Sequence, residues 1–205
     1  HTSTSEVYGT ALYTPIDEGH PLQGQSPYSA TKIAADKMAE AYSCSFGLPV
    51  VTLRPFNTYG PRQSARAVIP TIITQALAGN TVRLGSLDPV RDFTFVADTV
   101  RAFLLAAKKE EAVGKTIHTG SGIGISIGDL ARKVLLQVNP SARILSGEGR
   151  VRPERSEVMR LVCDSRRAWE ILGWRPEVAL DEGLSRTIDW FRDHREGYKP
   201  GRYTV

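Results

Sequence analysis

The chain has 205 residues, of which 41% are hydrophobic, and 26 basic residues against 22 acidic ones give it a net charge of +4. This size and hydrophobic content suffice for a packed core and exclude a disordered or low-complexity chain. Two cysteines exclude a disulfide scaffold, and no apolar run reaches the ~20 residues of a membrane span, so we expect a cytoplasmic protein without a membrane partner. The basic excess gathers in residues 143–167, which favours a local anion site over a nucleic-acid surface.

Helices and strands are predicted in alternation along the chain. Apolar spacing and short β-branched runs predict, in order, a helix over residues 28–45, a strand over 50–53, a helix over 70–78, a strand over 82–84, a helix over 97–109, a strand over 116–119, and helices over 126–138, 166–172 and 180–194. Ser126 is the predicted N-cap of its helix, with Asp129 three residues on. This alternation predicts an α/β fold with a parallel sheet covered on both faces, although three strands are few for a complete sheet.

Tyr28 and Lys32 lie four residues apart in the first predicted helix, so they share one helix face. A nearby ammonium stabilises a phenolate and lowers a phenol pKa from about 10, which makes such a pair usable as a general base. Tyr-x-x-x-Lys also recurs by chance, and the alternative is a tyrosine at the core edge beside a solvated lysine.

Two polar segments strengthen the catalytic interpretation, because each follows the carboxyl end of a strand. Residues 3–9 contain hydroxyls and a carboxylate, and residues 54–62 follow the strand over 50–53. Parallel α/β folds bind their ligands at this edge of the sheet. We therefore expect both segments and the Tyr28 helix to converge there.

Together these motifs resemble the extended short-chain dehydrogenase/reductase family, specifically its NAD-dependent nucleotide-sugar epimerases, dehydratases and decarboxylases. The resemblance covers nearly the whole chain and rests on residues 4–9 (TSEVYG), 26–32 (SPYSATK), 54–62 (RPFNTYGPR), 90–98 (VRDFTFVAD) and 172–174 (LGW). It implies the C-terminal part of a Rossmann-like doubly wound parallel sheet with a smaller mixed α/β substrate-binding lobe. The implied partial NAD-binding domain comprises residues 1–60 and 93–120, and the lobe residues 61–92 and 121–205.

One departure from the family pattern concerns the start of the chain. The Gly-rich phosphate loop and first βαβ unit of the family are absent, which implies that about a hundred residues precede His1. We therefore expect the 205-residue chain by itself to be inactive. The residue that selects NAD over NADP would lie in the same missing part.

The resemblance also implies catalytic and cofactor-binding roles. Tyr28 would take the proton of the sugar 4-hydroxyl as hydride passes to NAD, and Lys32 would hold the nicotinamide ribose. Thr4 would bond the 4-oxygen, while Pro55 and Phe56 would border the nicotinamide.

Glu6 and Ser5 separate the subfamilies. Dehydratases and UDP-glucuronate decarboxylases carry Glu where simple 4-epimerases carry a small or apolar residue, and Glu6 would remove the carbon-5 proton made acidic by a 4-ketone. Thymidine-linked glucose dehydratases carry Asp where Ser5 stands, so Ser5 disfavours that substrate. The alternative for Glu6 is a solvated carboxylate at a strand end.

Substrate binding is implied for four further residues. Asn57, Arg91 and Arg152 would approach the diphosphate, for which Arg offers bidentate hydrogen bonds, and Glu157 the nucleotide ribose. No histidine or cysteine spacing indicates a metal site.

The resemblance therefore implies an NAD-dependent nucleotide-sugar 4,6-dehydratase. Residues 62–70 (RQSARAVIP) resemble bacterial dehydratases of the legionaminic-acid type, which implies a UDP- or GDP-linked N-acetylglucosamine-type substrate and a 4-keto-6-deoxy product. The alternatives are a 4-epimerase, a UDP-glucuronate decarboxylase, and a non-catalytic module that serves assembly or substrate binding. Family members also imply a homodimer through the helix over residues 28–45.

Overall fold

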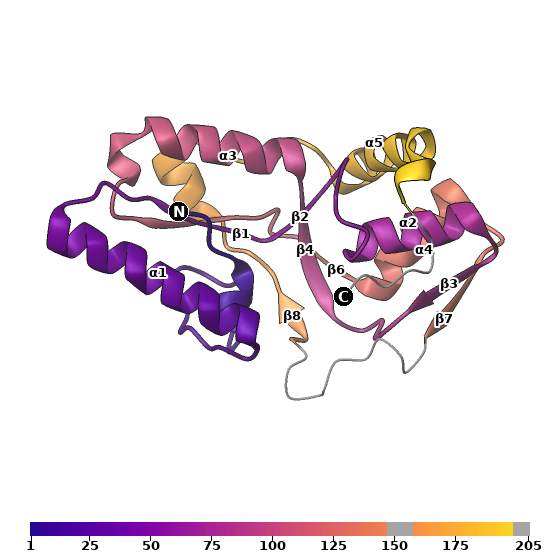
Figure 1. Cartoon of the computed structure of the whole chain (residues 1–205), viewed down its shortest axis with the longest axis horizontal. Helices are drawn as coiled ribbons and strands as arrows, with labels where there is room; N and C mark the ends of the chain where they lie inside the picture. The colour runs from indigo at the N-terminus through magenta and orange to yellow at the C-terminus, as the bar shows by residue number, and fades with distance from the viewer. Residues whose placement is uncertain (147–157, 199–205) are drawn as a thin grey trace.

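The computed structural model describes residues 1–146 and 158–198. A parallel sheet flanked by two helices forms one end of the molecule (Figure 1). It contains α1 (Pro27–Phe46), β1 (Thr52–Pro55), α3 (Val96–Lys108) and β5 (Thr116–Thr119). The helices lie on opposite sides of β1, as expected for a Rossmann-like sheet covered on both faces.

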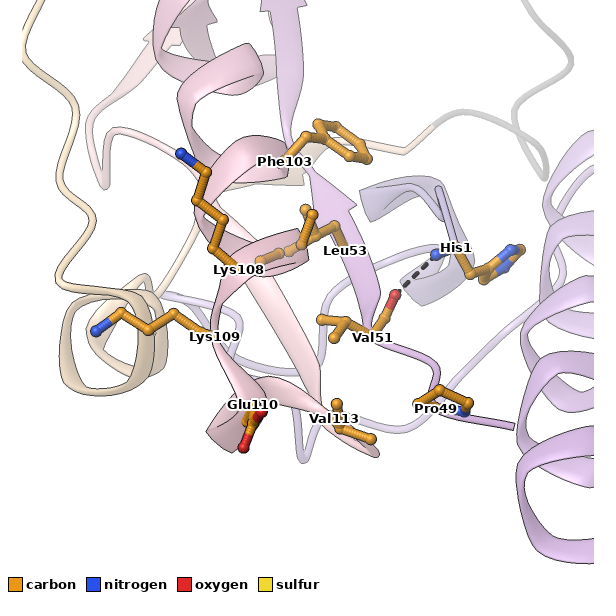
Figure 2. A pocket seen from close by; sticks show the side chains of 11 residues that line it. His1, Pro49, Val51, Leu53, Phe103, Lys108, Lys109, Glu110 and Val113 are labelled. Atoms are coloured by element: carbon orange, nitrogen blue, oxygen red, sulfur yellow. Dashed lines mark hydrogen bonds between the residues drawn. The ribbon is translucent and has the colours of Figure 1, made fainter. Parts of the chain in front are cut away.

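The strand β1 has parallel neighbours on both sides. Leu53 pairs with Ile117 of β5 and forms a bridge with Thr2 of the first segment. That segment is held by Ser3 N, which donates to Leu53 O at 2.7 Å, and by His1 N, which donates to Val51 O at 2.8 Å (Figure 2). Residues 4–9 therefore follow the carboxyl end of a strand, as the sequence predicts.

The first turn of α1, which contains Tyr28, is fixed by a capping box and a proline. Ser26 Oγ accepts from Ser29 N, Ser29 Oγ accepts from Ser26 N, and Pro27 occupies the first helical position. Gly47, at φ +65°, ends the helix in the left-handed region. Tyr28 thus stands in a firmly capped first turn.

The other end of the molecule combines short strands with helices (Figure 1). Its strands are β2 (Asn57–Tyr59), β3 (Thr81–Leu84), β4 (Val90–Phe95), β6 (Gly124–Ser126), β7 (Arg143–Ser146) and β8 (Arg160–Leu161). The strand β4 pairs parallel with β2 and β8 and antiparallel with β6, and β3 pairs parallel with β7. The sequence did not predict β2, β4, β6, β7 or β8. The strands β2, β6 and β8 have three residues or fewer, and charged or polar residues interrupt the apolar positions of β4 (VRDFTF) and β7 (RILS).

Helices α2 (Val68–Ala78), α4 (Ile127–Val138) and α5 (Leu180–Asp193) enclose the largest core with β3 and β4. All three were predicted to within two residues, and Ser126 Oγ accepts from Asp129 N as expected. Residues 166–172 are helical and contain a π-helical turn, Ala168–Leu172, that ends at Gly173. The predicted strand over 50–53 lies two residues further on, because the ladder with β5 starts at Thr52.

Three short 3-10 helices complete the described elements: Ser5–Tyr8, Glu110–Ala112 and Arg195–Gly197. No helix among the described residues is both long and apolar enough to cross a bilayer.

Candidate active site

A cavity of about 670 Å³ opens at the carboxyl end of β1. The segments expected to converge at the sheet edge all reach it, together with residues from the loop before α2 and from β4. Its lining comprises Thr2, Ser3, Thr4, Ser5, Glu6, Tyr28, Pro55, Phe56, Asn57, Thr58, Gln63, Arg66, Ala67, Val68, Thr71, Leu84, Gly85, Ser86, Pro89, Arg91, Phe93 and Ile127. The convergence expected from the strand ends is therefore present in the structure.

A tight turn presents Thr4, Ser5 and Glu6 to the cavity. Thr4 Oγ1 accepts from Glu6 N at 3.2 Å and thereby caps the 3-10 helix Ser5–Tyr8. Gly9 ends the turn at φ +56°, where a Cβ would come within 2.9 Å of Gln23 O. The turn therefore needs glycine at this position and fixes where Glu6 emerges.

Tyr28 lines the cavity, whereas Lys32, one helical turn later, forms a hydrogen bond to the first segment of the chain. Tyr28 is 55% exposed and forms part of the cavity lining. Lys32 Nζ donates to Thr2 O at 2.6 Å, one helical turn after Tyr28. Lys32 is not part of the cavity lining, and its bond instead connects α1 to the segment that carries Thr4.

The end of β1 supplies an apolar wall with one buried polar atom. Phe56 is buried and, with Pro55, forms part of the lining. Asn57 Nδ2 is buried without a hydrogen-bond partner among the described residues. Buried donors are normally satisfied, so a ligand that brings an acceptor fits this wall. Pro55 and Phe56 at the end of β1 and Asn57 at the start of β2 thus line one cavity.

Arg91 on β4 brings a fixed positive charge to the cavity. Its side chain is nearly buried, and Nη1 donates to Val90 O at 3.0 Å. The neighbouring Asp92 carboxylate accepts from Ser121 N, Ser121 Oγ, Gly122 N and Cys163 N, which holds β4 to the loop after β5. Arg152 and Glu157, the other predicted substrate-binding residues, lie outside the described residues.

The sequence interpretation missed two lining residues in the loop before α2. Arg66 is exposed at the cavity, and Gln63 Nε2 donates to Thr58 O at 2.8 Å. The resemblance of residues 62–70 indicates a subfamily but no role for Arg66, although this arginine follows the same strand end that places Asn57 among the candidates. Arg66 and Arg91 bring positive charges to the cavity lining from the loop before α2 and from β4. Glu6 and Tyr28 bring a carboxylate and a phenol to the same lining from residues 3–9 and from α1.

A buried polar chain that contacts the lining residue Phe56 was also missed. Arg54 Nη1 donates to Tyr8 Oη at 2.6 Å, and Tyr8 Oη lies 2.5 Å from His118 Nε2. His118 Nδ1 donates to Ile16 O at 3.2 Å, so its Nε2 accepts from the tyrosine. Burial, and then the Arg54 charge, lower the His118 pKa to about 3, while burial raises the Tyr8 pKa. His118 is therefore neutral in the folded protein near neutral pH.

A second cavity, of about 480 Å³, is lined by His1, by residues 49–53 and by α3 with the turn that follows it. Figure 2 shows Val51, Leu53 and Phe103 in it, and the ammonium groups of Lys108 and Lys109 extend away from His1. It gathers no combination of acid, base and hydroxyl groups such as the first cavity holds. Within residues 1–146 and 158–198, no cluster of three His, Cys, Asp or Glu side chains could hold a metal ion.

Comparisons with known proteins agree with this geometry. The chain matches the model of a family described as GDP-mannose 4,6 dehydratase over residues 1–187. It is 35% identical to a dTDP-glucose 4,6-dehydratase of an Actinoplanes species over 198 residues, which is 95% of this chain and 60% of the relative. A UDP-glucose 4-epimerase of Mycolicibacterium smegmatis is 34% identical over 94% of this chain and 62% of the relative.

Solved structures give the same fold. The dTDP-glucose 4,6-dehydratase DesIV of Streptomyces venezuelae, determined with NAD bound, superposes with a TM-score of 0.86 at 32% identity. The match covers 97% of this chain and 61% of that one. The chain thus spans about three fifths of the length of these relatives.

Proposed function

The chain belongs to the GDP-mannose 4,6-dehydratase family, a group of NAD-dependent nucleotide-sugar enzymes, and from this membership we propose that the protein is an NAD-dependent nucleotide-sugar 4,6-dehydratase. One observation carries the proposal: Thr4, Glu6 and Tyr28 line a single cavity. A hydroxyl, a carboxylate and a phenol are the groups that carbon-4 oxidation followed by elimination requires.

Tyr28 is the proposed base for the first step. Its side chain lines the cavity, and its hydroxyl takes the proton of the sugar 4-hydroxyl, while Thr4 Oγ1 bonds the 4-oxygen. When bound, the nicotinamide cofactor supplies the hydride acceptor at carbon 4 and the hydride donor at carbon 6. Pro55 and Phe56 offer an apolar wall for its ring, and Lys32, one turn from Tyr28, offers an ammonium to its ribose.

Glu6 is the proposed base for the elimination. Once carbon 4 is a ketone, the carbon-5 proton is acidic; the Glu6 carboxylate accepts it and passes it to the carbon-6 hydroxyl, which leaves as water. The capped turn holds Glu6 on the same side of the cavity as Thr4. This carboxylate favours dehydration over simple epimerisation.

The substrate is proposed to be UDP- or GDP-linked and of the N-acetylglucosamine type. Arg91 and the unpaired Asn57 Nδ2 suit a diphosphate, and Arg152 and Glu157 are proposed to complete its binding. Ser5, in place of an acid, and the loop over residues 62–70 support a hexosamine over thymidine-linked glucose. Two of the similar proteins are named for dTDP-glucose, so both classes belong in the test.

A homodimer through α1 is part of the proposal. Met38, Tyr42 and Phe46 recur every four residues and are exposed, which leaves an apolar stripe on the helix. Sedimentation of the natural protein tests the dimer, and Phe46→Glu should shift it to monomer.

The cytoplasmic location and the division into an NAD-binding part and a substrate lobe remain proposals.

The second candidate is a nucleotide-sugar 4-epimerase, which the 34% identity to a named UDP-glucose 4-epimerase favours. The test incubates the natural, full-length protein with NAD and UDP-, GDP-, CDP- or dTDP-linked hexoses and weighs the products. Loss of one water supports the dehydratase. An unchanged mass with an inverted centre supports the epimerase, loss of carbon dioxide from UDP-glucuronate supports a decarboxylase, and absence of turnover supports an assembly or binding module.

A further inference from the structure

Asp36 is a buried carboxylate on the helix that carries Tyr28. It lies one turn after Lys32, and its side chain is only 5% exposed. Among the residues of α1, Ser29 and Asp36 are the buried ones, and Ile33 is partly buried against the core that contains Tyr8 and Phe56. The hydrogen bonds of Asp36 therefore act together with this apolar contact in fixing the position of the helix.

Four donors meet the Asp36 carboxylate. Arg54 Nε and Nη2 donate to Oδ2 at 3.1 and 2.9 Å, Ser3 Oγ donates to the same oxygen at 2.7 Å, and His1 Nε2 lies 2.8 Å from Oδ1. The Arg54 side chain is 7% exposed and also donates to Tyr8 Oη. The ion pair is thus buried, and both oxygens of the Asp36 carboxylate have polar partners.

These donors come from the two other segments that form the site. Ser3 immediately precedes Thr4, and Arg54 immediately precedes Pro55. Lys32 adds its bond to Thr2 O, so two contacts one helical turn apart join α1 to the first segment. Two such contacts fix both the height and the rotation of α1 against Thr4 and Glu6.

We propose that Asp36 and Arg54 are positioning residues, which hold Tyr28 at its working distance from Thr4, Glu6 and the end of β1. This inference rests on the proposed function for its kinetic consequence. Buried ion pairs contribute little net stability compared with apolar residues of similar size, whereas removing one partner leaves an uncompensated charge. Fixing the helix is therefore a better account of the pair than stability alone.

The test compares Asp36→Asn with a matched control in the natural, full-length protein. The control is Asp98→Asn, because Asp98 is equally buried, pairs with Arg101 and accepts from Glu177 N and Val178 N, but lies outside the cavity. Both variants should lose thermal stability. Asp36→Asn should also lower kcat by about 10- to 100-fold, with KM changed far less, because small displacements of reacting groups slow the chemical step. Asp98→Asn should keep kcat.

Arg54→Lys gives a second variant. Lysine keeps the positive charge but cannot donate two hydrogen bonds to Asp36 as the Arg54 guanidinium does, so kcat should fall less than in Asp36→Asn. An unchanged kcat in Asp36→Asn, or an equal fall in Asp98→Asn, would overturn the positioning role.

Amide hydrogen exchange separates this inference from the proposed function. Residues 1–9 and 27–36 should exchange faster in Asp36→Asn than in Asp98→Asn, whatever reaction the enzyme catalyses. If the wild type turns over no nucleotide sugar, the proposed function fails, and the exchange result alone decides the positioning role. Unchanged exchange in residues 1–9 would then reject it.

Discussion

The ammonium of Lys32 donates a hydrogen bond of 2.6 Å to the backbone carbonyl oxygen of Thr2. This contact joins the Tyr28 helix to the segment that carries Thr4 and Glu6, two parts of the chain that the sequence predicts to converge at one edge of the sheet.

Tyr28→Phe should abolish most turnover. The side chain is half exposed, so the change costs little packing, while loss of the hydroxyl removes the proposed base. We expect kcat to fall about 10²- to 10⁴-fold with an unchanged melting temperature. Steady-state kinetics and a thermal melt check this, and a variant with more than half of the wild-type kcat would exclude Tyr28 as the base.

Glu6→Gln should separate oxidation from elimination. The backbone bond from Glu6 N to Thr4 Oγ1 keeps the turn, so only the carboxylate is lost. We expect dehydration to fall about 10²- to 10⁴-fold, together with exchange of the carbon-5 hydrogen with deuterated solvent. Mass spectrometry of recovered substrate measures this exchange. Wild-type exchange in Glu6→Gln would show that another group removes the proton.

His118 should make the protein less stable as the pH falls. The unfolded imidazole binds a proton below pH ~6.5, whereas the buried one has a pKa of about 3, so the unfolded state gains protons between these values. The lowered pKa of His118 therefore has no effect on stability above pH ~6.5. Below that pH it reduces the free energy of unfolding by about 1.4 kcal/mol per pH unit. Urea unfolding of the wild type and His118→Gln at several pH values measures it, and parallel pH dependences would contradict it.

Gly183→Ala should destabilise the larger core. A Cβ on Gly183 would lie 2.1 Å from Tyr59 Oη, which is buried and donates to Leu180 O, so the ring has no room to move. We expect a loss of about 1–3 kcal/mol of unfolding free energy. The control Gly79→Ala meets no atom within 4 Å and should change stability little. Equal denaturation midpoints for the two variants would refute the steric account.

Much of the fold was predictable because the long elements carry local signals. The Ser126 cap, the apolar face of α5 and the β-branched run of β5 each determine their own structure. The short strands β6 and β8 form because they pair with β4, and the residues of β6 and β8 alone do not predict this pairing. Strand pairing of this kind is a tertiary effect that sequence patterns do not contain.

The site was predictable where residues follow strand ends or share a helix face, as Glu6 and Tyr28 do. The Asp36 and Arg54 pair was not, because a charged residue at a single helical position is usually solvated, and its donors come from residues far along the chain. The role of Arg66 at the cavity likewise depends on how the loop folds back over the sheet edge.

Deuterium placed at carbon 4 of an accepted nucleotide hexose tests the proposed oxidation and elimination. If one cavity carries out both steps, the natural protein forms a product that lacks one water and carries the deuterium at carbon 6. A product of unchanged mass with the deuterium back at carbon 4 would refute the proposed dehydration.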